Sequence, residues 1–202
     1  MKKTPILIIV LLFVLVGLVA CKENSSSQRF LIKDAYITID INPSIEIITG
    51  EDGYIVQVNP LNQEAEVLLS GSNFVSKTIN EAIDEIIKLA ADLGYLDFTV
   101  ENAILVTTLV DNPDEEDSLQ AIIKKRIEAY IKDSKMRINI YRTKLENEEG
   151  LNEISEQYNI SLGKAKLITY AMTFDNTLSY EVAALMNMRE LNQIIILVLA
   201  LG

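Results

Sequence analysis

Apolar and polar residues alternate along three short segments early in the chain, at residues 35–41, 45–49 and 54–58. Alternation with a period of two is typical of a half-buried β-strand. The second and third segments are joined by Gly-Glu-Asp-Gly at residues 50–53, and these glycines can adopt the positive φ angles of a hairpin turn. The pattern therefore predicts one strand followed by a β-hairpin.

Later segments alternate between helical and strand-like patterns. Apolar residues recur at helical spacing over residues 79–90, and Gly94 is placed to end that helix. We predict, in order, a buried strand at 103–110, an acidic loop at 111–117, a helix at 118–132, a strand at 136–141 and helices from Leu145 onward. The fold class is therefore α+β. A small mixed sheet packed with helices is expected over residues 32–142, followed by a helical C-terminal appendage over 143–202.

The N-terminus has the pattern of an export signal. Lys2 and Lys3 precede an apolar run that ends at Ala20, which predicts a signal peptide over residues 1–20. Leu18-Val19-Ala20-Cys21 resembles the lipobox of bacterial lipoproteins, so Cys21 is the predicted lipidation site, palmitate being the expected class of acyl chain. The alternative is an uncleaved transmembrane anchor that ends at Cys21. Residues 21–31 are predicted to form a linker that carries the lipid anchor. Both alternatives place the residues after it at the extracytoplasmic face of the bacterial cell membrane.

Composition excludes several classes of function. The formal net charge is −11, which argues against nucleic-acid binding because that requires a basic surface. The sequence has no histidine, so histidine-based catalysis and histidine metal sites are excluded. We expect no metal, no cofactor and no enzymatic activity, apart from one cleavage of the chain itself that is considered next.

Three of the four prolines follow asparagine, at Asn42-Pro43, Asn59-Pro60 and Asn112-Pro113. Asn42-Pro43 lies between two predicted strands. Because Pro43 has no amide hydrogen, its nitrogen cannot attack the asparagine side chain. The remaining reaction is attack by the Asn42 side-chain nitrogen on its own backbone carbonyl, which expels Pro43 and requires a fixed geometry. The alternative is that Pro43 only sets the bend between the strands.

Two stretches of the chain are distinctive, namely A-Y-I-T-I-D-I-N-P-S-I-E-I and G-Y-I-V-Q-V-N-P-L-N. Both resemble the extracytoplasmic domain of the anti-sigma-I factor RsgI family. N-E-A-I-D-E-I-I, N-A-I-L-V-T-T and N-I-S-L-G-K-A-K-L-I follow in the order of the family. The resemblance implies cleavage at Asn42-Pro43, with Asp40, Ser44 and Glu46 as motif neighbours of unassigned role. It also implies that separation of the two fragments can start regulated membrane proteolysis.

Family members also carry a cytoplasmic anti-sigma domain before a transmembrane helix. Here only residues 1–4 precede the apolar run, so we expect no sigma-binding domain and no direct sigma factor binding. The sequence predicts a membrane-anchored extracytoplasmic signalling or interaction domain, which cleaves itself at Asn42-Pro43 and has a membrane-protein or cell-wall partner. The alternative is a surface lipoprotein that binds a small ligand or glycan in a concave pocket.

Overall fold

The computed structural model of the protein describes residues 31–145 and 150–201. The chain divides into two compact units, residues 1–30 and Leu31–Gly202, and the second unit is described here by itself. The predicted signal peptide and Cys21 therefore lie outside the described residues. None of the helices between residues 31 and 201 that the structure describes has the length and apolar character that a bilayer crossing requires.

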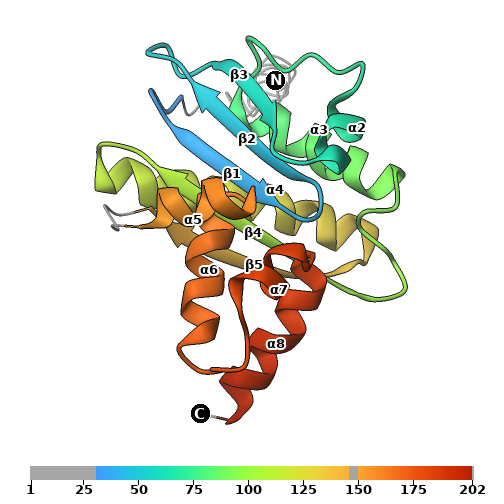
Figure 1. Cartoon of the computed structure of the whole chain (residues 1–202). Coiled ribbons are helices and arrows are strands. Elements are labelled where there is room, and N and C mark those ends of the chain that lie inside the picture. The colour runs from blue at the N-terminus through green and yellow to red at the C-terminus, as the bar shows by residue number, and fades with distance from the viewer. Residues whose placement is uncertain (1–30, 146–149, 202) are drawn as a thin grey trace, which may run out of the picture. The chain divides into compact units, whose positions relative to one another are not determined.

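A five-stranded mixed sheet forms the centre of the unit, in the order β3-β2-β1-β4-β5 (Figure 1). The strands are β1 (Tyr36–Asp40), β2 (Ser44–Thr49), β3 (Ile55–Pro60), β4 (Glu101–Leu109) and β5 (Arg137–Lys144). β1 is the central strand and pairs antiparallel with both β2 and β4. β4 and β5 are parallel. The predicted α+β fold with a mixed sheet is confirmed.

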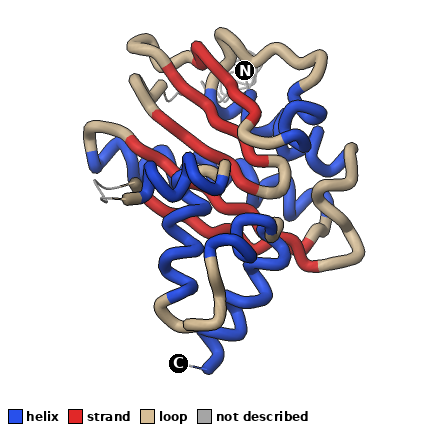
Figure 2. Tube along the Cα trace, in the orientation of Figure 1, coloured by secondary structure: helices blue, strands red, loops and turns tan. Residues whose placement is uncertain are grey.

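Helices cover both faces of this sheet (Figures 1 and 2). Their bounds are α2 (Gln63–Leu69), α3 (Ile79–Asp92), α4 (Pro113–Ser134), α5 (Leu151–Tyr158), α6 (Leu162–Met172), α7 (Tyr180–Leu185) and α8 (Met188–Leu201). On one face, Ile37 and Ile39 of β1 share a core with α3 and α4. On the other face, Leu105 of β4 shares a second core with Ile168 of α6 and Leu191 of α8. Helices α6 and α8, which follow β5, thus pack directly on the sheet.

Three local predictions need correction. Residues 113–117 of the predicted acidic loop form the beginning of α4, because the Asn112 side chain accepts from the Asp114 N–H and Pro113 occupies the first turn. Proline is well tolerated there, and acidic side chains are favoured near the positive end of a helix. Helix α2 lies in a segment where no helix was expected, and β5 continues to Lys144, beyond the predicted end at residue 141.

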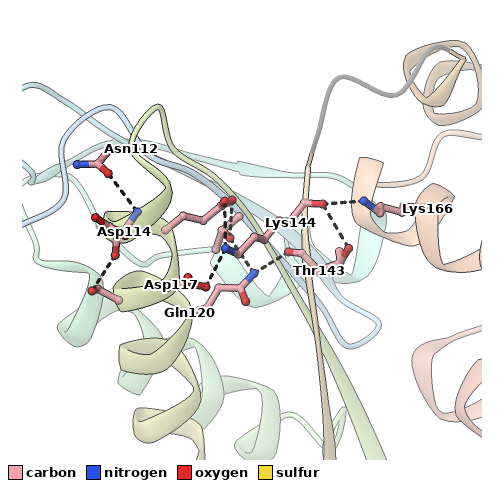
Figure 3. Close-up of polar contacts among 10 residues, drawn as sticks. Asn112, Asp114, Asp117, Gln120, Thr143, Lys144 and Lys166 are labelled. Atoms are coloured by element: carbon pink, nitrogen blue, oxygen red, sulfur yellow. Dashed lines mark hydrogen bonds and ion pairs between the residues drawn. The ribbon is translucent and has the colours of Figure 1, made fainter.

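Side chains at the end of β5 join the helices on both faces (Figure 3). The Lys144 ammonium lies 2.7 Å from the Asp117 carboxylate of α4. The Gln120 side chain of α4 donates to the Thr143 carbonyl at 2.8 Å. From the opposite face, the Lys166 ammonium of α6 donates to the Lys144 carbonyl at 2.9 Å. These contacts connect α4 and α6 through one strand.

Gly163 brings α6 against β4, and this contact generates a prediction. A Cβ atom at position 163 would lie 1.7 Å from the Thr107 hydroxyl oxygen. We therefore expect Gly163→Ala to lower the free energy of unfolding by about 1–3 kcal/mol, although alanine alone would favour the helix by about 1 kcal/mol. Urea denaturation of the full chain in detergent micelles measures the change.

The control is the double variant Gly163→Ala/Thr107→Ala. Truncating Thr107 removes its hydroxyl and methyl groups, so the double variant should lose less stability than the two single changes added together. A Gly163→Ala protein as stable as the wild type would show that α6 does not pack on β4 at this distance.

Candidate functional site

The Asn42-Pro43 bond lies in the turn of the central hairpin. Asp40 of β1 pairs with Ser44 of β2, so Ile41, Asn42 and Pro43 make the connection between the two strands. The Ile41 N–H donates to the Pro43 carbonyl at 2.8 Å, and Pro43 is buried. The structure therefore places the predicted scissile bond inside a tight and largely enclosed turn.

Asn42 has a strained backbone. Its φ angle is 109°, a region that residues other than glycine seldom adopt, at a cost of about 1–3 kcal/mol. The other two Asn-Pro pairs are relaxed. Asn59 belongs to strand β3 and has no positive φ, while Asn112 caps α4 at φ −98°. Of the three pairs, Asn42-Pro43 alone carries this strain.

The Asn42 side chain is held by Asn62, a residue that the sequence reasoning missed. The Asn62 Nδ2 group donates to Asn42 Oδ1 at 3.2 Å. Asn62 Oδ1 accepts from the N–H of Ala65 at 3.0 Å as the cap of α2, and from the N–H of Ser44 at 3.1 Å. Asparagine followed by Gln63 and Glu64 is a helix-start signal, which could have revealed both α2 and its capping residue.

Asp40 lies beneath the turn and is completely buried, with an exposed fraction of 0%. Its Oδ2 atom accepts from the Ser161 hydroxyl at 2.7 Å, whereas its Oδ1 atom has no hydrogen-bond partner among the described residues. Burial raises the pKa of Asp40, while hydrogen bonds from Ser161, Ser44 and Thr38 and the charge of Lys164 oppose that rise. Two of the motif neighbours, Asp40 and Ser44, are therefore brought together.

Lys164 of α6 supplies the positive charge that acts on Asp40. Its ammonium group donates to the carbonyl oxygens of Ala184 at 2.8 Å and Met186 at 2.6 Å. Burial lowers the pKa of Lys164, and the charge of Asp40 acts in the opposite direction. The Met188 N–H at the start of α8 also donates to the Ile41 carbonyl at 3.2 Å. The turn is thus contacted by helices that lie more than a hundred residues later in the chain.

Glu46, the third motif neighbour, points to a different partner. Its Oε1 atom accepts from the Asn59 side chain at 2.5 Å across the β2–β3 pair. Glu46 thus contacts the second Asn-Pro pair rather than the Asn42-Pro43 turn, and the structure does not bring all three motif neighbours together. Cys21 lies outside the described residues, so its predicted lipidation stays a prediction.

A small cavity of about 190 Å³ borders Asn42. Its lining is mostly polar and includes Asn102, Asn187 and Arg189, with Tyr95 as its single tyrosine. Small-molecule sites usually measure about 300–1,000 Å³, so this cavity is smaller than a usual ligand site. Within residues 31–145 and 150–201 no group of three or more side chains could hold a metal ion.

Comparison with known proteins identifies the class of this domain. Residues 34–170 match a family described as the anti-sigma factor RsgI-like central domain. The chain therefore belongs to the anti-sigma-I factor RsgI family, as its sequence motifs indicate. This membership assigns it a role in signalling and regulation.

The relatives are considerably longer proteins. The chain is 32% identical over 167 residues to anti-sigma-I factor RsgI6 of Acetivibrio thermocellus. The aligned region covers 78% of this chain and 21% of that protein. It is 33% identical over 94 residues to anti-sigma-I factor RsgI of Bacillus subtilis, covering 46% of this chain and 24% of the relative. The chain thus spans less than a quarter of the length of either protein.

The buried Asp40 carboxyl predicts a pH dependence of stability. Because the pKa of Asp40 is raised in the folded protein, the folded state binds its proton more tightly than the unfolded state does. Stability should therefore fall as pH rises from the ordinary carboxyl pKa of about 4 to the raised value. In this window, the free energy of unfolding of the wild type should fall by up to about 1.4 kcal/mol per pH unit relative to that of Asp40→Asn.

Urea denaturation of the full chain at a series of pH values measures this difference. Both proteins should also carry Asn42→Gly, since glycine accepts the positive φ angle and removes the side chain expected to cut the backbone. An identical stability difference between the two proteins at every pH would contradict the assignment of a raised pKa to Asp40.

Proposed function

We propose that this chain is a membrane-anchored extracytoplasmic signalling domain that cuts its own backbone once, between Asn42 and Pro43. The observation that carries the proposal is the combination at Asn42 of a strained φ angle of 109° and a side chain held by Asn62. A lipid on Cys21 or an N-terminal transmembrane anchor would hold the domain at the membrane. It would act with a membrane-protein or cell-wall partner.

The atoms that react in the proposed cleavage all belong to Asn42 and Pro43. Asn42 Nδ2 attacks the backbone carbonyl carbon of Asn42 and forms a succinimide ring. The proton lost from Nδ2 passes to the Pro43 nitrogen as the bond between that carbon and that nitrogen breaks. The products are a fragment that ends in the succinimide and a fragment that begins with Pro43 as a free secondary amine. Water then opens the ring.

The sheet offers a reason why the two fragments would stay together. The first fragment ends with β1, which is hydrogen-bonded to β2 and to β4 of the second fragment. Ile37 and Ile39 of β1 are completely buried in the core with α3 and α4. Cutting the turn removes one covalent bond and leaves these contacts in place. Separation of β1 from the sheet would then be the event that carries the signal.

Self-cleavage is tested by comparing the full chain with its Asn42→Gly variant. Wild type should give two fragments on a denaturing gel, with intact masses that place the cut between Asn42 and Pro43. The first fragment should be lighter by one water than its hydrolysed form while the succinimide persists. Asn42→Gly should remain whole, because glycine fits the turn but provides no nucleophile.

Asn59→Gly is the matched control, since it alters a second Asn-Pro pair and should be cut like the wild type. A wild-type chain that stays whole after prolonged incubation under native conditions would contradict self-cleavage and favour the alternative that Pro43 only sets the bend.

Membrane anchoring is tested at Cys21. Cells that express the full chain should incorporate an alkyne-labelled palmitate into it, and Cys21→Ser should abolish both the label and the signal peptide cleavage that precedes the cysteine. Membrane retention of an unlabelled wild-type chain would instead support the uncleaved transmembrane anchor. The Asn42→Gly chain, which leaves the N-terminus unchanged, is a suitable control.

A further inference from the structure

We infer that Asn62 is a positioning residue for the cleavage, which orients the Asn42 side-chain amide so that its nitrogen faces away from Asn62. This inference rests on the proposed self-cleavage at Asn42-Pro43. Asn62 lies 20 residues beyond Asn42 at the start of α2. It contacts the chain on both sides of the Asn42-Pro43 bond, through the Asn42 side chain and the Ser44 backbone N–H.

Two backbone donors fix the orientation of the Asn62 amide. Its Oδ1 atom accepts from Ser44 at 3.1 Å and from Ala65 at 3.0 Å. A rotation that exchanged oxygen and nitrogen would point the NH₂ group at two N–H donors, which is unfavourable. Nδ2 must therefore point away from these donors, and it meets Asn42 Oδ1 at 3.2 Å.

This contact in turn fixes the Asn42 amide. Because Asn62 presents a donor, Asn42 must present its oxygen, which directs Nδ2, bonded to the same carbon in the same plane, away from Asn62. Among the described residues, Asn42 Nδ2 has no hydrogen-bond acceptor that would hold it back from attack.

The other two Asn-Pro pairs lack this arrangement. The Asn59 Nδ2 group donates to the Glu46 carboxylate at 2.5 Å, so its nitrogen is engaged by an acceptor. The Asn112 side-chain oxygen accepts from the backbone N–H of Asp114 at 3.0 Å. Within the described part of the chain, Asn42 is thus the one asparagine before a proline whose oxygen is held by another side-chain amide while its nitrogen has no partner.

Asn62 also has a structural role as the cap of α2, and the test must separate the two roles. In the variant Asn62→Asp, the new carboxylate would still accept from Ser44 and Ala65, because aspartate is among the best helix caps. It would present an acceptor oxygen to Asn42 in place of the Nδ2 donor. Asn42 would then turn its own nitrogen toward position 62, which withdraws it from the backbone carbonyl.

The experiment measures the rate at which newly synthesised full chain is cut, by pulse labelling and a denaturing gel. Asn62→Asp should slow cleavage by about tenfold to a hundredfold, as expected for a mispositioned nucleophile. Asn73→Asp is the matched control: it makes the same chemical change at an exposed asparagine whose Oδ1 also accepts a backbone N–H, at 3.1 Å from Val75. It should cleave at the wild-type rate.

A second measurement separates positioning from folding. Asn62→Asp combined with Asn42→Gly should unfold in urea at the same midpoint as Asn42→Gly alone. If the double variant is destabilised, Asn62→Ser is used in place of Asn62→Asp. Serine caps α2 without charge and is too short to reach Asn42. Asn62→Ser should therefore also slow cleavage at unchanged stability.

The outcomes distinguish the two proposals. Cleavage of Asn62→Asp or of a stable Asn62→Ser at the wild-type rate would overturn the role of Asn62 and leave self-cleavage intact. Slow cleavage that only follows a loss of stability in both variants would also overturn it. A wild-type chain that is not cut at all would overturn the proposed function itself.

Discussion

The turn between β1 and β2 depends on one constraint, namely that Asn42 is held at a φ angle of 109° although it is not glycine. A strained residue persists only where the surrounding structure fixes it. Here the fixing contacts come from Asn62 at the start of α2 and from Met188 at the start of α8. Neither helix is adjacent to the turn in sequence, so the strained conformation requires the complete fold.

Polar groups beneath the turn extend this dependence to a third helix. The Asp40 carboxylate is fully buried and accepts from Ser161, which caps α6. Lys164 on the same helix is nearly buried and donates to two carbonyl oxygens near the end of α7. Burying a carboxylate and an ammonium group is costly unless their partners stay in place. Movement of α6 or α7 would therefore disturb the contacts of Asp40 at the end of β1.

Strands β1, β2 and β3 could be predicted because apolar and polar residues alternate along them, as at Ile37 and Ile39. Strand β4 could be predicted from its continuous apolar run. The fourteen-residue helix α3 was also clear from its spacing. Helix α2 was missed because it is seven residues long and buries only Ala65 and Leu68, too few positions for a periodic signal. The beginning of α4 was missed because Pro113 reads as a loop residue although it starts a helix.

The residues of the candidate site likewise divide into those that the sequence indicates and those that only the structure reveals. Asn42 and Pro43 could be singled out from the chemistry of the dipeptide alone. The contact between Asp40 and Ser161 spans 121 residues, and nothing in the local sequence of either residue indicates the other. Asn62 was overlooked because its role depends on side-chain orientation, which follows from the backbone donors of Ser44 and Ala65.

The central position of β1 has a mechanical consequence. Because β1 is antiparallel to both of its neighbours, tension applied along this strand against the rest of the sheet would shear two ladders at once. Hydrogen bonds loaded in this way share the force, unlike those at a sheet edge, which can be peeled apart one after another. After a cut in the β1–β2 turn, these two hydrogen-bond ladders would hold the fragments together under weak tension and would break together under strong tension.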